Sequence, residues 1–206
     1  MVGEPVETRL IGGVEKREIK IVVYDADWPK KFEKHAKRIA DALGGSALRV
    51  EHIGSTSVPG LAAKPIIDIL VVVPNSAHES AYLPRLKAAG YVLRVREPDW
   101  NEHRMFRTPQ KDVHIHIYSA GCPEIERNLA FRDRLRRNSD DRRRYEQTKR
   151  ELAAKEWADM NAYAEAKTEV IESIIASSPI SGGRASEHLR DCESLVVVMR
   201  PQMDAT

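Results

Sequence analysis

Cysteine is nearly absent from this chain of 206 residues, and long apolar runs are missing. The only two cysteines, Cys122 and Cys192, form neither a CxxC motif nor a disulfide framework, which suits a reducing compartment. No apolar stretch approaches the roughly 18 residues that cross a membrane. The opening MVGEPVETRL has no signal-peptide core. We therefore expect a cytoplasmic protein with no membrane partner.

A large charge of one sign is also lacking. The chain has 33 basic and 31 acidic side chains, so its formal net charge is only +2. A balance this close to zero does not favour nucleic acid as a partner. The hydrophobic share of 42% and the charged share of 31% are those of a soluble globular protein. The length suits one domain with extensions.

The chain divides into three parts by composition. Residues 1–18 are polar and predict a flexible N-terminal arm. Residues 19–176 predict one domain, with a sheet part over 19–122 and a helical part over 123–176. Residues 177–206 are rich in serine, glycine and polar groups and predict a flexible tail. Within that tail, 195–199 (LVVVM) reads either as a docked strand or as an unpaired segment.

Hydrophobic periodicity predicts an α+β fold with a mixed sheet and flanking helices. Strands are expected near 19–24, 47–53, 66–73, 91–95, 105–107 and 113–118. A first helix should begin after Asp25 or Asp27 as N-cap and end at Gly44, and a second should span about 78–89. The helical part should hold three helices, ending near 137, spanning about 140–154 and spanning about 156–175.

The most informative stretch is VEHIGSTSVPGLAAKPIIDILVVV, residues 50–73. A Gly-Ser-Thr-Ser turn separates two apolar runs, and Asp68 interrupts the second run. A carboxylate in an apolar strand is costly to bury unless a cation or hydrogen bonds compensate it. The turn offers backbone N–H groups and hydroxyls that can hold phosphate oxygens. Together these features predict a site for a metal-bound phosphate, although a structural salt bridge would also explain Asp68.

Three other side chains bear on this site. Lys64 precedes the second run and could neutralise a phosphate or simply be solvated. His114 and His116 are two apart on a strand, hence on one face. With Asp68 they could bind Zn²⁺ or Mn²⁺ in preference to Mg²⁺. Alternatively, an imidazole such as that of His116 could act as a general base, or the pair could be structural.

The helical part is rich in arginine, but acidic side chains are interleaved with the basic ones. Such a pattern is typical of solvated helices with ion pairs between residues i and i+4. The alternative is a set of arginines that closes over a nucleotide. Arg132 and Arg136 share one helix face, as do Tyr145 and Lys149, and Tyr163 and Lys167.

These motifs resemble a known family. His52-Ile53-Gly54-Ser55, followed thirteen residues after Ser55 by Asp68, is similar to the opening motif of the nucleotidyltransferase superfamily, which has the polymerase-beta-like fold. More narrowly, HIGSTSVPGLAAKPIIDI resembles the GrpB family, some members of which are fused to dephospho-CoA kinase. The likeness covers about residues 19–176, including YDADWP (24–29), FRDRLR (131–136), Tyr145-xxx-Lys149 and Tyr163-xxx-Lys167.

The resemblance implies a nucleotidyltransferase-like mixed sheet and a site for a nucleotide or a phosphorylated small molecule. Its expected phosphate contacts are Gly54, Ser55, Thr56, Ser57, Lys64, Arg132, Lys149 and Lys167. The expected metal ligands are Asp68, His114 and His116, with Mg²⁺, Mn²⁺ or Zn²⁺ as the cation. One departure stands out: position 70 is Leu, where an active member of the superfamily has its second carboxylate. Two-metal chemistry of the usual kind is therefore in doubt.

Three hypotheses follow. The chain could transfer a nucleotidyl or phosphoryl group, with Asp68 and His116 in catalytic roles. Alternatively, it could be a catalytically degenerate module that binds a nucleotide or a CoA precursor, or assists a kinase. Because the chain has no Walker GxxxxGK[ST] motif, that kinase partner would be a separate polypeptide. A metal-dependent hydrolase built on Asp68, His114 and His116 is the third reading.

Overall fold

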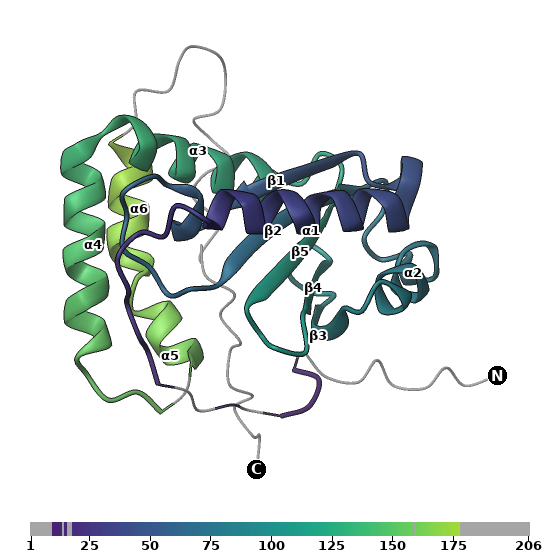
Figure 1. Cartoon of the computed structure of the whole chain (residues 1–206), viewed down its shortest axis with the longest axis horizontal. Coiled ribbons are helices and arrows are strands. Elements are labelled where there is room, and N and C mark those ends of the chain that lie inside the picture. Colours follow the sequence, from purple (N-terminus) through teal and green to yellow (C-terminus); the bar gives the residue numbers. More distant parts are fainter. Residues whose placement is uncertain (1–9, 14, 16–17, 159, 178–206) are drawn as a thin grey trace.

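A five-stranded mixed sheet forms the centre of the protein, and helices cover both of its faces (Figure 1). The computed structural model describes residues 10–13, 15, 18–158 and 160–177. The strand order is β1-β2-β5-β4-β3. β2 and β5 pair in parallel, whereas the other neighbouring strands are antiparallel. The predicted α+β class with a mixed sheet and flanking helices is confirmed.

The strands follow the predicted apolar runs closely. They are β1 (Arg49–Ile53), β2 (Ile67–Val73), β3 (Val92–Glu97), β4 (His103–Arg107) and β5 (Val113–Ser119). β2 and β5 lie in the middle of the sheet and pair with partners on both sides. Asp68 and both strand histidines therefore lie on the two central strands, where backbone motion is most restricted.

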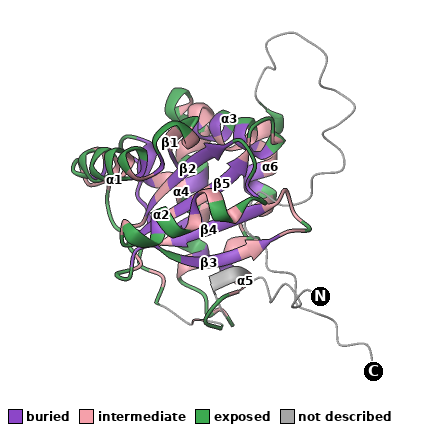
Figure 2. Cartoon of the chain, turned by 90° about the vertical axis from the view of Figure 1, so that its right-hand side faces the viewer, coloured by how far each residue is buried: buried purple, intermediate pink, exposed green. Residues whose placement is uncertain are grey.

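One face of the sheet packs against α1 (Trp28–Leu43) and α2 (Leu83–Ala88). Trp28, Ile39 and Leu43 of α1 are buried against the sheet, and Gly44 ends the helix as predicted. This face holds the main apolar core, and Figure 2 shows the strands largely buried. The alternation of side chains along β2 and β5 then leaves Asp68, His114 and His116 on the other face.

The helical part covers that other face. Its helices are α3 (Pro123–Arg137), α4 (Ser139–Ala153), α5 (Met160–Glu165) and α6 (Thr168–Ala176). α3 packs its Ile125 and Leu129 on Leu70 and Tyr118 of the sheet. A further apolar cluster joins α3, α4 and α6 to Val58 and Leu61, in the loop after the Gly-Ser turn. In Figure 1, α4 and α6 lie side by side at one end of the sheet.

Two predictions of secondary structure are wrong. Residues 19–24 form no strand: the run makes a single isolated bridge, between Val22 and Ala63, and Val23 is largely exposed. A β-prone run becomes a strand only where a partner strand runs alongside it. The expected single helix over 156–175 is divided into α5 and α6, with the break at 166–167. Apolar periodicity does not locate such a break.

Part of the expected N-terminal arm lies among the described residues. Leu10 bridges to Val95, and the Arg94 guanidinium donates to the Gly13 carbonyl at 2.5 Å. Glu15 pairs with Arg107 at 2.8 Å. Residues 1–9 and 178–206, including the 195–199 segment, lie outside the described residues. Within the part of the chain that is described, no helix is long and apolar enough to cross a membrane.

Leu70 offers a test of this packing. It is fully buried among Ile53, Val72, Tyr118 and the α3 side chains. We expect Leu70→Ala to lower the free energy of unfolding by about 2–5 kcal/mol, because it removes buried methyl groups and leaves a cavity. The matched control is Leu48→Ala, since Leu48 is 54% exposed and should change stability by less than about 0.5 kcal/mol. Urea unfolding checks both, and equal midpoints would contradict this packing.

Candidate functional site

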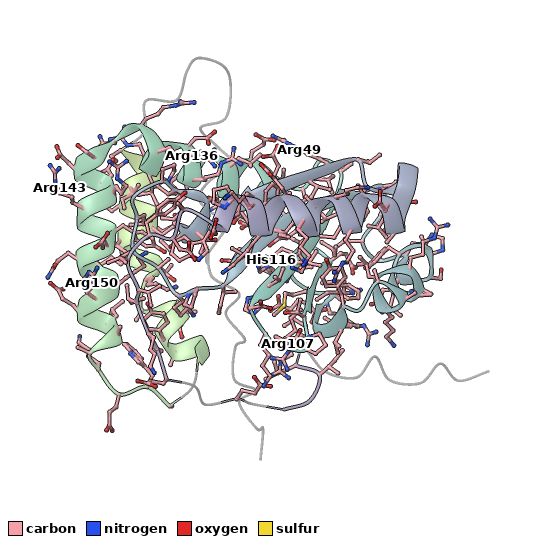
Figure 3. All side chains as sticks on the ribbon, viewed as in Figure 1. Arg49, Arg107, His116, Arg136, Arg143 and Arg150 are labelled. Atoms are coloured by element: carbon pink, nitrogen blue, oxygen red, sulfur yellow. The ribbon has the colours of Figure 1, made fainter. Side chains whose placement is uncertain are left out.

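Asp68, His114 and His116 come together across the two central strands. The parallel register places Asp68 opposite His114 and Leu70 opposite His116. The Asp68 Oδ1 atom lies 3.5 Å from His114 Nδ1 and 3.7 Å from His116 Nε2. One ligand atom from each of the three residues falls within 4.8 Å of the others. Figure 3 labels His116 near the middle of the molecule. The sequence-predicted trio therefore converges, with donor atoms facing one another.

The trio is strongly coupled electrostatically. Burial raises the pKa of Asp68, but the adjacent His114 and His116 outweigh it and hold that pKa well below its usual range. Burial lowers the pKa of His114, and the Asp68 carboxylate opposes that shift. At neutral pH the site thus contains a carboxylate and an uncharged His114 imidazole, the protonation states that a metal ion requires.

The Gly-Ser turn is folded directly onto Asp68. Gly54 has a φ of +67°, and a Cβ atom built on it would lie 2.5 Å from Asp68 Oδ2. No other amino acid fits both the conformation and the space. Ser55–Ser57 then form a 3-10 turn, η2. The turn and the carboxylate are therefore one structural unit, not neighbours along the sequence alone.

The hydroxyls of the turn have different partners. Ser57 Oγ donates to the Gly54 carbonyl at 2.6 Å, and Thr56 Oγ1 donates to the Ile66 carbonyl at 3.2 Å. Both side chains are buried, so their observed bonds shape the turn. The half-buried Ser55 instead presents its hydroxyl to the phenol of Tyr145 on α4. Ser55 is thus the turn residue that faces the helical part.

His52 supports the turn from the opposite side of the sheet. Its ring stacks on Phe32 of α1 at 4.7 Å between centroids, and its Nε2 lies 3.1 Å from Thr56 Oγ1. Burial lowers the pKa of His52 to about 4. A neutral His52 is therefore a fixed support for the turn, and it is not part of the Asp68 trio.

Three lysines converge beside the trio. The Nζ atoms of Lys64 and Lys167 lie 5.1 Å and 4.7 Å from the ring centroid of Tyr163. Lys149 Nζ lies 4.9 Å from the ring centroid of Tyr145. Burial, followed by repulsion from Lys64 and Lys149, lowers the pKa of Lys167 to about 7. Burial also lowers the pKa of Lys149 to about 7, with Arg150 and Lys64 adding to the effect and Glu146 opposing it. We call Lys64, Lys149 and Lys167 the lysine cluster.

Side chains of α3 and α4 also hold the loop in place. Lys149 Nζ donates to the Ala62 carbonyl, while Glu146 accepts from the Ala62 amide at 3.0 Å. Arg136 donates to the Ser57 carbonyl at 2.8 Å. Arg132 donates to Glu51 at 2.8 Å and to the His52 carbonyl at 3.1 Å. Arg132 therefore ties α3 to β1, and its role in phosphate binding stays an untested prediction.

Sequence reasoning missed two parts of this region. Tyr163 is buried, and its ring also lies under two of the lysines. His103 follows a polar stretch of the sequence, yet it is fully buried between Glu97 and His116. The signal was present in the alternation His103-Met105-Arg107, but the register of the β4–β5 pair was needed to use it.

The structure shows what surrounds Leu70, the residue that stands where a second carboxylate was expected. Leu70 follows Asp68 on the same face of β2 and is buried in the apolar cluster beneath α3. The His116 ring is its partner on β5. Among the described residues, the group that could supply three metal ligands here consists of Asp68 and the two histidines of β5.

The sequence and the fold of this chain are similar to those of known proteins. A sequence model of the GrpB protein family matches residues 18–177. A UPF0157 protein of Halalkalibacterium halodurans is 54% identical over 157 residues, covering 76% of this chain and 80% of that protein. This chain therefore belongs to the GrpB protein family.

Two further proteins are similar to this chain. The crystal structure of the conserved protein GrpB from Enterococcus faecalis is 33% identical, with a TM-score of 0.68, and covers 76% of this chain and 98% of that one. A dephospho-CoA kinase of Mycolicibacterium paratuberculosis is 29% identical over 180 residues; the match covers 75% of this chain but only 44% of the kinase. The GrpB structure supports the fold, and the kinase match shows that a similar segment occurs within a longer protein.

Gly54 provides a test of the turn's contact with Asp68. We expect Gly54→Ala to lower the free energy of unfolding by more than the about 1–2 kcal/mol that left-handed backbone costs a residue with a Cβ atom. The reason is the added overlap with the Asp68 carboxylate. Gly60→Ala is the matched control, because Gly60 has a φ of +77° with nothing within 4 Å of the built Cβ. Equal losses in urea unfolding would mean that Asp68 is not pressed against the turn.

The lysine cluster predicts a pH dependence. The pKa of Lys167 is about 7 in the folded protein, below the ordinary value of 10.5. Between those two values the unfolded chain binds more protons, so wild-type stability should rise with pH there. We expect Lys167→Met to be more stable than wild type at pH 6, to keep only part of that advantage at pH 9, and to lose the rest as the pH approaches 10.5.

Urea unfolding at several pH values measures this effect. Lys87→Met, which removes an exposed lysine from α2, controls for the loss of a surface charge. A stability difference between Lys167→Met and wild type that does not change with pH would contradict the lowered pKa of Lys167 in the folded protein.

Proposed function

We propose that this protein binds a divalent cation at Asp68, His114 and His116 and uses it, with the lysine cluster, to hold the phosphate groups of a nucleotide or a phosphorylated small molecule. The observation that carries the proposal is the convergence of the three donor atoms on one face of the central strands.

The spacing of the donors suits a metal ion. Metal–ligand bonds of about 2.1 Å at tetrahedral angles place neighbouring donor atoms about 3.4 Å apart. The observed separations from Asp68 Oδ1 are 3.5 Å and 3.7 Å. Two imidazoles and one carboxylate favour Zn²⁺ or Mn²⁺ over Mg²⁺, which prefers oxygen ligands. Three protein ligands also leave coordination positions for a phosphate oxygen or water.

The lysine cluster supports an anionic ligand. Burial, followed by repulsion from Lys64 and Lys149, lowers the pKa of Lys167. Such an arrangement lowers the stability of the protein alone, whereas a phosphate placed among the three charges would relieve the repulsion. Lys167 and Asp68 interact, so the cluster adjoins the proposed cation. The metal and the lysines could therefore contact the same phosphate group.

The chemical contribution of each group can be assigned. A bound cation would polarise a phosphoryl oxygen as a Lewis acid. The lysines would neutralise charge on the other phosphate oxygens, and Gly54 keeps Asp68 aimed at the cation. In this arrangement Asp68 and His116 act as ligands. The favoured reaction class is the transfer of a nucleotidyl or phosphoryl group, which depends on positioning and charge neutralisation.

A second candidate function is binding without turnover. Leu70 fills the position beyond Asp68 with a buried side chain, so a second cation lacks a carboxylate there. The likeness to part of a dephospho-CoA kinase supports a role as a module that binds a CoA precursor or assists a separate kinase. Both functions use the same site, and they differ only in whether the bound molecule is changed.

Thermal melts test the proposal. We expect Zn²⁺ or Mn²⁺ together with a nucleoside triphosphate or dephospho-CoA to raise the melting temperature of the wild-type protein. A ligand at 100 times its dissociation constant adds about 2.7 kcal/mol, or roughly 5–10 °C at this size. Asp68→Ala should abolish the shift. Asp41→Ala is the control, because Asp41 is exposed on α1 and pairs with Lys37 of the same helix.

The outcomes separate the two functions. A metal-dependent shift with turnover of the nucleotide supports transfer. The same shift with an unchanged nucleotide supports the binding module. No shift with any metal or phosphate compound, or a shift that survives in Asp68→Ala, would overturn the proposed site.

A further inference from the structure

Behind His116, a chain of buried polar groups leads away from the proposed cation site. His103 Nε2 lies 3.1 Å from His116 Nδ1, and His103 Nδ1 lies 2.7 Å from Glu97 Oε2. His103 is fully buried and Glu97 is 4% exposed. Glu97 and His103 face each other across the β3–β4 pair, so the register itself creates this contact. We call Glu97, His103 and His116 the polar chain.

We propose that Glu97 and His103 fix His116 in the tautomer that carries its proton on Nδ1, which leaves the Nε2 lone pair directed at Asp68. Glu97 and His103 are thus positioning residues for His116. The tautomer follows from the polar chain itself, whereas its consequence for metal binding rests on the proposed function.

The direction of the hydrogen bonds follows from donor chemistry. A carboxylate only accepts, so His103 must carry a proton on the Nδ1 that faces Glu97. A neutral His103 then has a bare Nε2, which can only accept. His116 Nδ1 must be the donor in the 3.1 Å contact. The result is a bare Nε2 on His116, the nitrogen that lies nearest Asp68.

Two observations support a neutral His103. His103 is fully buried between the rings of Tyr118 and Trp100, which disfavours a charged imidazolium. The competing arrangement would have His116 Nε2 donate to Asp68, but that separation is 3.7 Å, longer than the 3.1 Å contact with His103. The contacts on the His103 side are the shorter ones, so they determine the proton's position.

The surroundings of His103 restrict its movement. Tyr118 stacks on the ring at 4.9 Å between centroids, and Trp100 meets it edge-on at 5.5 Å. The hairpin tip that presents Trp100 contains Asn101 and Glu102 with φ values of 52° and 49°. Two adjacent non-glycine residues in this conformation are unfavourable and persist only where the surrounding structure holds them. The His103 amide closes this turn on the Trp100 carbonyl at 3.0 Å.

The polar chain resembles the second shell of known metal centres in its chemistry. A histidine ligand usually donates its other ring N–H to a carboxylate or a carbonyl, which fixes its tautomer and raises its basicity. Here the carboxylate of Glu97 acts through a second imidazole. The arrangement also distinguishes the two strand histidines, because His116 has this support, whereas His114 contacts Asp68 and His116.

Long-range ¹H–¹⁵N spectra of the imidazoles test the tautomer directly, with or without metal. We expect His103 and His116 of the wild-type protein each to carry the proton on Nδ1, with Nε2 bare. His103→Phe, of similar shape, should release His116 to a mixture of tautomers. Glu97→Gln, a milder variant, should give a mixture.

His35→Phe is the matched control. His35 is partly buried on α1 and bonds to the Tyr91 hydroxyl at 2.8 Å, remote from the polar chain. The His116 spectrum should not change in this variant. Wild-type His116 protonated on Nε2, or a His116 signal unaffected by His103→Phe and Glu97→Gln, would overturn the inference.

Zn²⁺ titration measures the consequence. We expect His103→Phe to weaken Zn²⁺ binding by about 10–100-fold relative to wild type and to His35→Phe. Equal affinity in His103→Phe would contradict the positioning role while leaving the metal site intact. A wild-type protein that binds no Zn²⁺ or Mn²⁺ would instead contradict the proposed function, and the imidazole spectra would still decide the tautomer.

Discussion

The arrangement of this protein depends on how it keeps one carboxylate, that of Asp68, inside a sheet. An ionised group on a central strand is tolerated only if its surroundings compensate the loss of water. Here Gly54 brings the turn against one carboxylate oxygen, and the histidines of β5 approach the other. The helical part then closes over this region through the lysine cluster and the apolar contacts of Val58 and Leu61. Helices far along the sequence are therefore positioned by the turn that holds Asp68.

The two sides of the sheet have different roles. On one side of the sheet, α1 and α2 supply an apolar core that keeps β2 and β5 rigid. On the other, Asp68 and the histidines lie between the lysine cluster and the polar chain. The lysines carry repelling charges, which disfavours the folded state, and natural binding sites commonly accept such a loss of stability for function. The polar chain has the opposite character, because its groups bond to one another and restrict motion.

Much of the fold could be predicted, because apolar periodicity and turn residues are local signals. The five strands of the sheet and the first two helices of the helical part follow from them. The strand predicted over 19–24 does not form, because strand formation depends on a partner that lies elsewhere in the chain. The convergence of Asp68 with His114 and His116 could be anticipated from alternation along two strands. The position of His103 could not, since it depends on the register between β4 and β5 and on a hairpin tip with unusual backbone angles.

The central claim is that Asp68, His114 and His116 form one cation site. The most direct measurement is an anomalous difference map from crystals grown with Mn²⁺ or Zn²⁺ and inorganic pyrophosphate. The account predicts one strong peak bonded to Asp68, His114 and His116 Nε2, with phosphate density between that peak and the lysine cluster. A map with no peak at these three residues, in crystals whose metal is bound elsewhere or not at all, would contradict it.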